Sequence, residues 1–226
     1  MNSLFIIIPV YNEEKNINAL LNEWLKIVPK YFKQKYKFFV INDGSTDKTH
    51  QEIKKIKSNS IIYIKQKNIG HANSCLKGYK IALKKKYDII FQIDSDNQCD
   101  PKYFKYFLKL IKNNKAVFGY RYKREDGFLR KIFSILLSLL IFFRTFIYIK
   151  DSNVPYRMIK KEILKKVINS IPRDVVLKNV YLSYLIQKNF EIKWTKIIFR
   201  RRAFGKTNYN FKDLAFMTLN LLSKLR

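Results

Sequence analysis

The amino-acid sequence predicts an α/β fold in which helices flank a mostly parallel, Rossmann-like sheet. Over the first 120 residues, short apolar runs rich in β-branched and aromatic side chains alternate with longer segments whose apolar residues recur at helical spacing. A repeated strand–helix–strand order is typical of parallel sheets with helices on both faces. With 226 residues, the chain is long enough for one domain of ordinary size and too short for two large ones.

The elements follow one another in a regular order. The first apolar run has no basic segment before it and is followed at once by polar residues, which indicates a strand and not a signal peptide. Strands are expected at 4–10, 37–41, 61–64, 88–93 and 116–120. Helices are expected where Ile17, Leu20, Leu21, Trp24 and Val28 recur, and then at 48–57, 71–86 and 101–113.

The charge of the chain indicates a polyanionic partner. Its 46 Lys and Arg residues against 17 Asp and Glu give a formal net charge of +29, while a hydrophobic content of 47% excludes general disorder. Nucleic acid, an anionic bilayer or a phosphorylated ligand would each fit, and a compositional bias of the genome is the alternative reading. All ten arginines lie between Arg121 and Arg226, so we expect phosphate recognition after residue 120.

Polar segments follow four of the predicted strands. They read YNEE (11–14), NDGSTD (42–47), NIGH (68–71) and DSDNQ (94–98). In parallel sheets, ligands bind beyond the carboxyl ends of the strands, so these segments are expected to converge on one crevice. Carboxylates gathered there would repel one another unless a cation or hydrogen-bond donors occupied the site.

The segment Asp94-Ser95-Asp96 is the strongest candidate for chemistry. Two carboxylates at a strand end, with Gln98 as a neutral oxygen donor, suit a hard divalent ion that also binds the phosphates of a substrate. The alternative is a turn that uses Asp and Ser only for its backbone geometry.

Two further residues are candidates for ligand contacts. Asp43 follows the second strand and could accept hydrogen bonds from a nucleobase, whereas Asp47 is better explained as a helix cap. His71 could face a phosphate, although an ordinary surface histidine is the alternative. Cys75 and Cys99 form no CxxC pair and indicate two ordinary thiols in a reducing compartment.

Several motifs in order resemble glycosyltransferase family 2, and in particular its dolichol-phosphate mannose synthase and polyprenyl-phosphate sugar transferase branch. The resemblance extends from residue 4 to about residue 210. The motifs are IPVYNEEKNI (8–17), VINDGSTDKT (40–49), NIGHANSCLKGYKIAL (68–83), QIDSDNQCDP (92–101), GYR (119–121), DSNVPYR (151–157) and RAFGKT (202–207).

The resemblance implies a GT-A fold and a nucleotide-sugar donor held with Mg²⁺ or Mn²⁺. It further implies one domain over 1–226, whose first half (1–120) binds the donor and whose second half (121–226) receives the acceptor and meets the membrane. Implied base and ribose contacts are Pro9, Tyr11, Glu13, Ile41 and Asp43. We count His71, from its place in the loop, among the expected donor contacts as well. Implied ribose, diphosphate and metal contacts are Asp94, Ser95, Asp96 and Gln98.

The same resemblance implies how phosphate is gripped in the second half. Arg121 and Arg202 match the phosphate-gripping arginines, and Arg130 with Ser134 matches the acceptor end. Asn208 stands where the branch usually has lysine, and Lys206 is close enough to replace that contact. With Asp94 and Asp96, Arg121 and Arg202 are thus the expected catalytic residues.

Two apolar segments, 130–149 and 211–226, predict contact with a membrane surface. Lys131, Ser134, Ser138 and Thr145 form a narrow polar stripe on an otherwise apolar helix, which is typical of a helix in the lipid interface or buried between protein layers. Residues 132–149 are marginal for a bilayer span because they are short and contain Arg144. We therefore expect a peripheral protein on the cytoplasmic face of a membrane. The sequence leaves open whether it also binds a membrane protein.

The expected activity is inverting transfer of one sugar to a polyprenyl or dolichyl phosphate. A lipid phosphate is already ionised and needs no general base, and the segment IPRDVVLKN (171–179) offers only Asp174 as one. Three alternatives stay open: a hydroxyl-acceptor transferase of cell-surface polysaccharide assembly with Asp174 as base, a basic nucleic-acid-binding protein, and an inactive subunit. No nucleic-acid-binding motif is present, and carboxylates in one crevice would repel its phosphates, so no nucleic-acid partner is expected.

Overall fold

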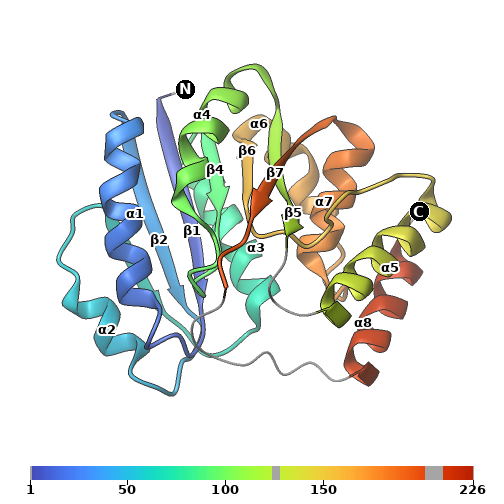
Figure 1. Ribbon diagram of the computed structural model, residues 1–226, viewed down its shortest axis with the longest axis horizontal. Coiled ribbons are helices and arrows are strands. Elements are labelled where there is room, and N and C mark those ends of the chain that lie inside the picture. Colours follow the sequence, from blue (N-terminus) through green and yellow to red (C-terminus); the bar gives the residue numbers. More distant parts are fainter. Residues whose placement is uncertain (1, 124–127, 202–210, 226) are drawn as a thin grey trace.

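A computed structural model of the chain describes residues 2–123, 128–201 and 211–225. Its centre is a seven-stranded sheet with the strand order β3-β2-β1-β4-β6-β5-β7 (Figure 1). The strands are β1 (Ser3–Val10), β2 (Lys35–Asn42), β3 (Ile61–Lys65), β4 (Ile89–Gln92), β5 (Ala116–Lys123), β6 (Arg157–Lys160) and β7 (Ile192–Ile198).

The sheet is mostly parallel, which confirms the predicted fold class. Strand β1 pairs in parallel with β2 and β4, β2 with β3, and β5 with β7, while β6 runs antiparallel to both of its neighbours. Because β6 is antiparallel to both β4 and β5, β5 runs in the same direction as β4, and β7 is parallel to β5. Strands β4, β5 and β7 therefore end at the same edge of the sheet as β1 and β2. The segments that follow these strands therefore meet at one edge of the sheet.

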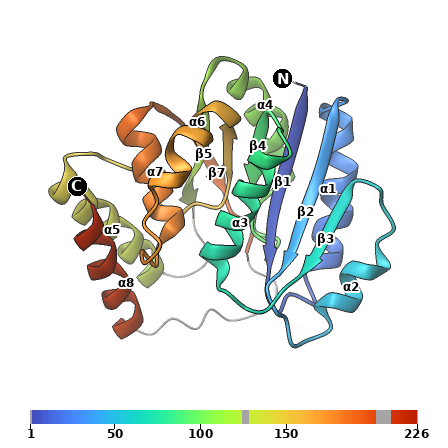
Figure 2. The same ribbon diagram turned by 180° about the vertical axis from the view of Figure 1, so that it is seen from behind.

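Helices cover both faces of the sheet. In Figure 1, α1 and α4 lie in front of it, and Figure 2 shows α3, α6 and α7 on the opposite face. The helical elements are α1 (Ile17–Tyr31), α2 (Thr49–Lys55), α3 (His71–Lys84), η1 (Pro101–Tyr103), α4 (Phe104–Asn113), α5 (Phe128–Thr145), α6 (Lys161–Val167), η2 (Ile168–Ser170), α7 (Lys178–Asn189) and α8 (Phe211–Lys224).

The sequence pattern predicted each strand and helix of the first half, with bounds displaced by a few residues. It did not place β6, α6, α7 or β7. Strand β6 is only four residues long, and β7 alternates half-buried residues with lysines, so neither has a continuous apolar run. The core between α1, α4 and the sheet is aromatic, and Trp24, Phe91 and Tyr156 are fully buried there with neighbouring ring centroids 4.9–6.2 Å apart.

Helices α5 and α8 pack against each other at one end of the molecule, beyond the β5 and β7 end of the sheet (Figure 1). Most of their large exposed side chains are apolar, although Arg144, Lys212 and Asp213 are exposed as well, whereas Ser138 of α5 and Thr218 of α8 are buried. Large exposed side chains on the two helices are Ile132, Ile135, Leu136, Leu139, Phe143, Phe216 and Leu219, and Phe146 and Tyr148 follow α5 directly. Within the described ranges, no helix has the length and hydropathy to cross a bilayer.

Candidate active site

Hydrogen bonds connect the segments that follow β1 and β2. The backbone N–H of Asn12 donates to Ser45 Oγ at 3.0 Å, and Asn12 Oδ1 accepts from the N–H of Thr46 at 2.9 Å. The N–H of Glu13 donates to Thr49 Oγ1 at 2.8 Å, which ties the start of α2 to the first segment. These segments therefore form one wall at the carboxyl edge, as the strand order predicted.

The predicted base and ribose residues lie at this wall. Pro9 and Ile41 are paired neighbours on β1 and β2 and are buried, whereas Tyr11 is 48% exposed. Glu13 is buried, and its Oε2 accepts from Asn16 Nδ2 at 2.6 Å. The ring of Tyr11 is thus accessible to a ligand, while Pro9, Ile41 and Glu13 form the buried part of the wall.

Asp43 is buried, and both described hydrogen bonds to its carboxylate fall on one oxygen. Its Oδ1 accepts from Gln66 Nε2 at 2.8 Å and from the N–H of Ile69 at 3.0 Å. Lys77 Nζ in turn donates to Gln66 Oε1 at 2.6 Å, so the orientation of the Gln66 amide is fixed. Gln66 was missed by sequence reasoning, although it directly follows β3 and the strand-end rule applied to it.

The same loops approach closely at Gly44. Its φ of +77° lies in the left-handed region, and a Cβ there would stand 2.7 Å from the backbone nitrogen of Asn68. Only glycine meets both conditions without strain. Gly44 therefore lets the segment after β3 close against Asp43.

Asp94 is the first carboxylate after β4, and its two oxygens lie in different surroundings. Oδ1 is closed to solvent and accepts no hydrogen bond, and His71 Nε2 lies 3.4 Å from it as an ion-pair contact. Burial lowers the pKa of His71, but electrostatic interactions with Cys75 and Asp94 outweigh this and raise the pKa above its usual value. The structure therefore brings His71 to the Asp94 carboxylate, at the start of α3.

The rest of the loop is held by one hydrogen bond of its own and by one to the segment that follows β7. Ser95 is buried, and Asp96 Oδ1 accepts from the N–H of Gln98 at 3.2 Å. Asn97 Oδ1 is also closed to solvent without a hydrogen-bond partner. Gln98 is buried, and its Nε2 donates to the carbonyl oxygen of Arg200 at 3.1 Å.

These oxygen donors fit a divalent cation. Carboxylate and amide oxygens suit Mg²⁺ or Mn²⁺, and the closed Oδ1 of Asp94 lacks the hydrogen bond that a buried carboxylate normally accepts. Among the described residues, no group of three or more His, Cys, Asp or Glu side chains is arranged for a metal ion. The thiol of the neighbouring Cys99 is fully buried, and its burial raises its pKa well above the usual value, so it stays protonated.

Arg121 lies at the same edge on β5, but Asp151 holds its guanidinium. Arg121 Nε and Nη2 donate to the two oxygens of Asp151 at 2.8 and 2.7 Å, and the backbone N–H of Arg121 donates to the same carboxylate. Both side chains are nearly buried. A phosphate at Arg121 would therefore share this arginine with Asp151, a partner that sequence reasoning missed within DSNVPYR.

A second buried arginine lies behind the site. Arg157 is fully buried on β6, and its guanidinium donates to three backbone carbonyls: those of Val154, Asn179 and Ser152. On the neighbouring β4, Gln92 Oε1 accepts from the hydroxyl of Tyr79 at 2.6 Å. These contacts form a polar layer under the Asp94 loop that the sequence pattern did not reveal.

Some predicted residues lie elsewhere or are not described. Ser134 is half-buried on α5, and the Arg130 side chain is not described although its backbone belongs to α5. Arg202 and Lys206 lie outside the described residues. Asp174 is exposed and forms a 2.6 Å ion pair with Lys224 of α8. A hydrogen bond from Lys224 lowers the pKa of Asp174, which makes this carboxylate a weaker base.

Comparison with known families identifies the class of protein. The sequence profile described as "Glycosyl transferase family 2" matches residues 5–168. The chain therefore belongs to glycosyltransferase family 2, as the motifs predicted.

Individual relatives place the chain within that family. It is 37% identical over 175 residues to an uncharacterised protein of Methanocaldococcus jannaschii, covering 72% of this chain and 73% of that protein. It is also 25% identical to the undecaprenyl-phosphate 4-deoxy-4-formamido-L-arabinose transferase of Proteus mirabilis, over 100% of this chain and 68% of the relative.

Solved structures show the same fold. Glucosyl-3-phosphoglycerate synthase from Mycobacterium tuberculosis, in a complex with Mn²⁺, UDP-glucose and phosphoglyceric acid, superimposes with a TM-score of 0.70 at 16% identity. The match covers 99% of this chain and 80% of that one. The predicted GT-A architecture is therefore confirmed.

Proposed function

We propose that this family 2 glycosyltransferase is an inverting hexosyltransferase that moves one sugar from a UDP- or GDP-linked donor to a polyprenyl phosphate. One observation carries the choice of acceptor: α5 and α8 expose many large apolar side chains, and they follow β5 and β7, whose ends share the edge of the Asp94 loop. The resemblance to undecaprenyl-phosphate transferases supports the same choice. The donor half would be 1–120 and the acceptor half 121–226, within a single domain.

In this reaction, an oxygen of the lipid phosphate attacks the anomeric carbon while the bond from that carbon to the nucleoside diphosphate breaks. The attacking phosphate is ionised at neutral pH, so no side chain has to remove a proton. A Mg²⁺ or Mn²⁺ ion held by Asp94, Asp96 and Gln98 would neutralise charge on the departing diphosphate. His71, Arg121, Arg130, Ser134, Arg202 and Lys206 are the proposed contacts of the donor and acceptor phosphates, and Asp94, Asp96, Arg121 and Arg202 are the proposed catalytic residues.

Asp43 is proposed to select the base. With Oδ1 used by Gln66 and Ile69, Oδ2 can accept from the ring N–H of uracil or guanine, whereas the ring nitrogens of cytosine and adenine at that position are acceptors. We expect Asp43→Asn to weaken UDP or GDP binding by about ten- to a hundredfold, the effect of one hydrogen bond to a charged group. Titration calorimetry measures it.

Asp47→Asn is the matched control for this variant. Asp47 lies in the same loop; its Oδ1 accepts from the N–H of Thr49 at 3.0 Å and its Oδ2 from the N–H of Glu14 at 3.2 Å. Asparagine keeps the shorter bond to Thr49 and loses only the longer one. Nucleotide affinity should be unchanged in Asp47→Asn. Equal affinity in Asp43→Asn would remove Asp43 from the base pocket.

The proposed location is the cytoplasmic surface of a membrane, without a span. A water-exposed helix normally shows its polar side to solvent, but α5 and α8 expose many large apolar side chains and bury Ser138 and Thr218. Lipid covering α5 and α8 would explain why apolar side chains face outward and these hydroxyl side chains face inward. The net charge of +29 favours an anionic leaflet.

Replacing Phe143 and Phe146 together by serine should weaken binding to vesicles of phosphatidylglycerol and phosphatidylcholine. The two rings are 72% and 82% exposed, and burying one such ring in lipid stabilises binding by about 1.5–3 kcal/mol. Sedimentation with vesicles should show a loss of at least about tenfold. Tyr106→Ser is the control, because Tyr106 is 50% exposed on α4, away from the α5–α8 pair. Equal losses in both variants would contradict a lipid-facing surface.

The acceptor is tested by supplying nucleotide sugars with undecaprenyl phosphate, dolichyl phosphate or a saccharide. The competing proposal is transfer to a saccharide hydroxyl with Asp174 as base. The ion pair with Lys224 and the resulting low pKa speak against that role. Transfer only to saccharides, lost in Asp174→Asn and retained in Arg130→Ala, would overturn the lipid-phosphate proposal.

A further inference from the structure

The segment that follows β7 is joined to the Asp94 loop by a pair of backbone-anchored hydrogen bonds. The N–H of Arg200 donates to the carbonyl oxygen of Gln98 at 3.1 Å, and the side-chain Nε2 of Gln98 donates back to the carbonyl oxygen of Arg200 at 3.1 Å. Because Nε2 is committed to Arg200, the orientation of the Gln98 amide is fixed. Its other end, Oε1, is the oxygen proposed for the metal.

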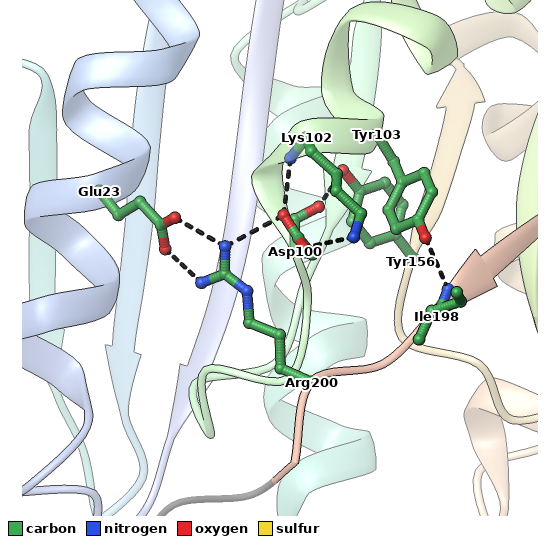
Figure 3. A network of polar contacts seen from close by, with 7 residues as sticks. All are labelled: Glu23, Asp100, Lys102, Tyr103, Tyr156, Ile198 and Arg200. Atoms are coloured by element: carbon green, nitrogen blue, oxygen red, sulfur yellow. Dashed lines mark hydrogen bonds and ion pairs between the residues drawn. The ribbon is translucent and has the colours of Figure 1, made fainter. Parts of the chain in front are cut away.

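The side chain of Arg200 anchors this pairing to the rest of the fold (Figure 3). Its guanidinium donates to both oxygens of Glu23 on α1, at 2.7 and 2.8 Å, and to Asp100 Oδ1 at 3.0 Å. Asp100 lies two residues after Gln98 and is itself held by the N–H of Lys102, at 2.9 Å, and by the Lys102 ammonium, at 3.1 Å.

This network depends on the geometry of arginine. One planar guanidinium neutralises two carboxylates that would otherwise repel each other, and it meets Glu23 through two parallel hydrogen bonds. Two neighbouring contacts surround it: the Tyr156 hydroxyl donates to the carbonyl oxygen of Asp100, and the N–H of Ile198 donates to the Tyr103 hydroxyl (Figure 3). The end of β7 at Ile198 and the segment around Asp100 are therefore both held in place next to Arg200.

We propose that Arg200 is a positioning residue for the donor diphosphate: by clamping Glu23 and Asp100, it holds Gln98 and the Asp94–Gln98 loop in the geometry that binds a metal–nucleotide complex. The inference rests on the proposed function and assigns Arg200 no contact with substrate. Arg200→Ala keeps the two backbone hydrogen bonds to Gln98 and removes only the contacts with Glu23 and Asp100 that position them. Loss of groups that orient a metal ligand typically changes metal affinity by about ten- to a hundredfold.

The test compares Mn²⁺-dependent UDP and GDP binding with metal-free uridine and guanosine binding. In Arg200→Ala we expect the metal–nucleotide affinity to fall by about ten- to a hundredfold and the metal-free nucleoside affinity to stay unchanged. Arg200→Lys should restore only part of the loss, because an ammonium cannot reproduce the bidentate contact. Glu23→Gln should show a smaller loss of the same kind, and it serves as the decisive variant if Arg200→Ala does not fold.

Lys102→Ala is the matched control. The Lys102 ammonium contacts the same Asp100 but does not connect it to Glu23 or to the segment after β7, and the backbone N–H of residue 102 still donates to Asp100 after the substitution. Metal–nucleotide affinity should therefore be unchanged in Lys102→Ala. Equal metal–nucleotide affinity in the wild type and in the Arg200 and Glu23 variants would overturn the positioning role. An equal fall in metal-free nucleoside affinity would overturn it too, because a general structural role predicts that result. Failure of the wild type to bind any metal–nucleotide complex would instead contradict the proposed function.

Discussion

Asp94→Asn and Asp96→Asn should each lower the rate of sugar transfer by about 10²- to 10³-fold, the usual cost of removing one group that stabilises charge in a transition state. Asp94 Oδ1 is closed to solvent with no hydrogen-bond donor, and an amide there would lose the charge that attracts a divalent ion. Mn²⁺-dependent UDP or GDP binding should fall with the rate. Rate assays and calorimetry measure the two effects.

The matched control is Asp88→Asn, because Asp88 precedes the same strand at the opposite edge of the sheet. Its carboxylate accepts from the N–H of Asn2 at 2.8 Å, and asparagine can still accept that hydrogen bond. Transfer and nucleotide binding should match the wild type in Asp88→Asn. If Asp94→Asn and Asp96→Asn kept their metal-dependent nucleotide affinity, the assignment of the DxD segment would be wrong.

Arg157→Met should lower the free energy of unfolding by about 1–3 kcal/mol, the usual cost of leaving a buried carbonyl without its donor. Methionine fills a similar volume, so the loss comes chiefly from the three missing hydrogen bonds. The carbonyls of Ser152 and Asn179 would still accept from the Ser183 hydroxyl, whereas that of Val154 would stay buried without this donor. Urea denaturation followed by circular dichroism measures the change.

Arg173→Met is the control for this variant. Arg173 is exposed, so its replacement should change the free energy of unfolding by less than about 0.5 kcal/mol. A loss below about 1 kcal/mol in Arg157→Met would show that water or a shifted backbone satisfies the three carbonyls. The polar layer beneath the Asp94 loop would then not depend on this arginine.

The sequence by itself determined the α/β fold, the first five strands and the position of the polar loops. Apolar runs such as 4–10 must be buried on both faces, and parallel strands place their carboxyl ends at one edge, so Asp43 and Asp94 had to approach each other. The motifs also identified the family, because the residues at those strand ends stand at a characteristic spacing.

Only the tertiary structure decided which polar groups pair. Arg121 with Asp151, Arg200 with Glu23, and Gln66 with Asp43 lie 23 to 177 residues apart, and no local pattern encodes such partners. The sequence also left open which side of α5 is covered, because a narrow polar stripe fits a helix in the lipid interface or one buried between protein layers. In the structure α5 packs against α8, and Ser138 of the stripe is buried. A helical period fixes which residues share a face, but burial of that face depends on what the rest of the chain packs against it.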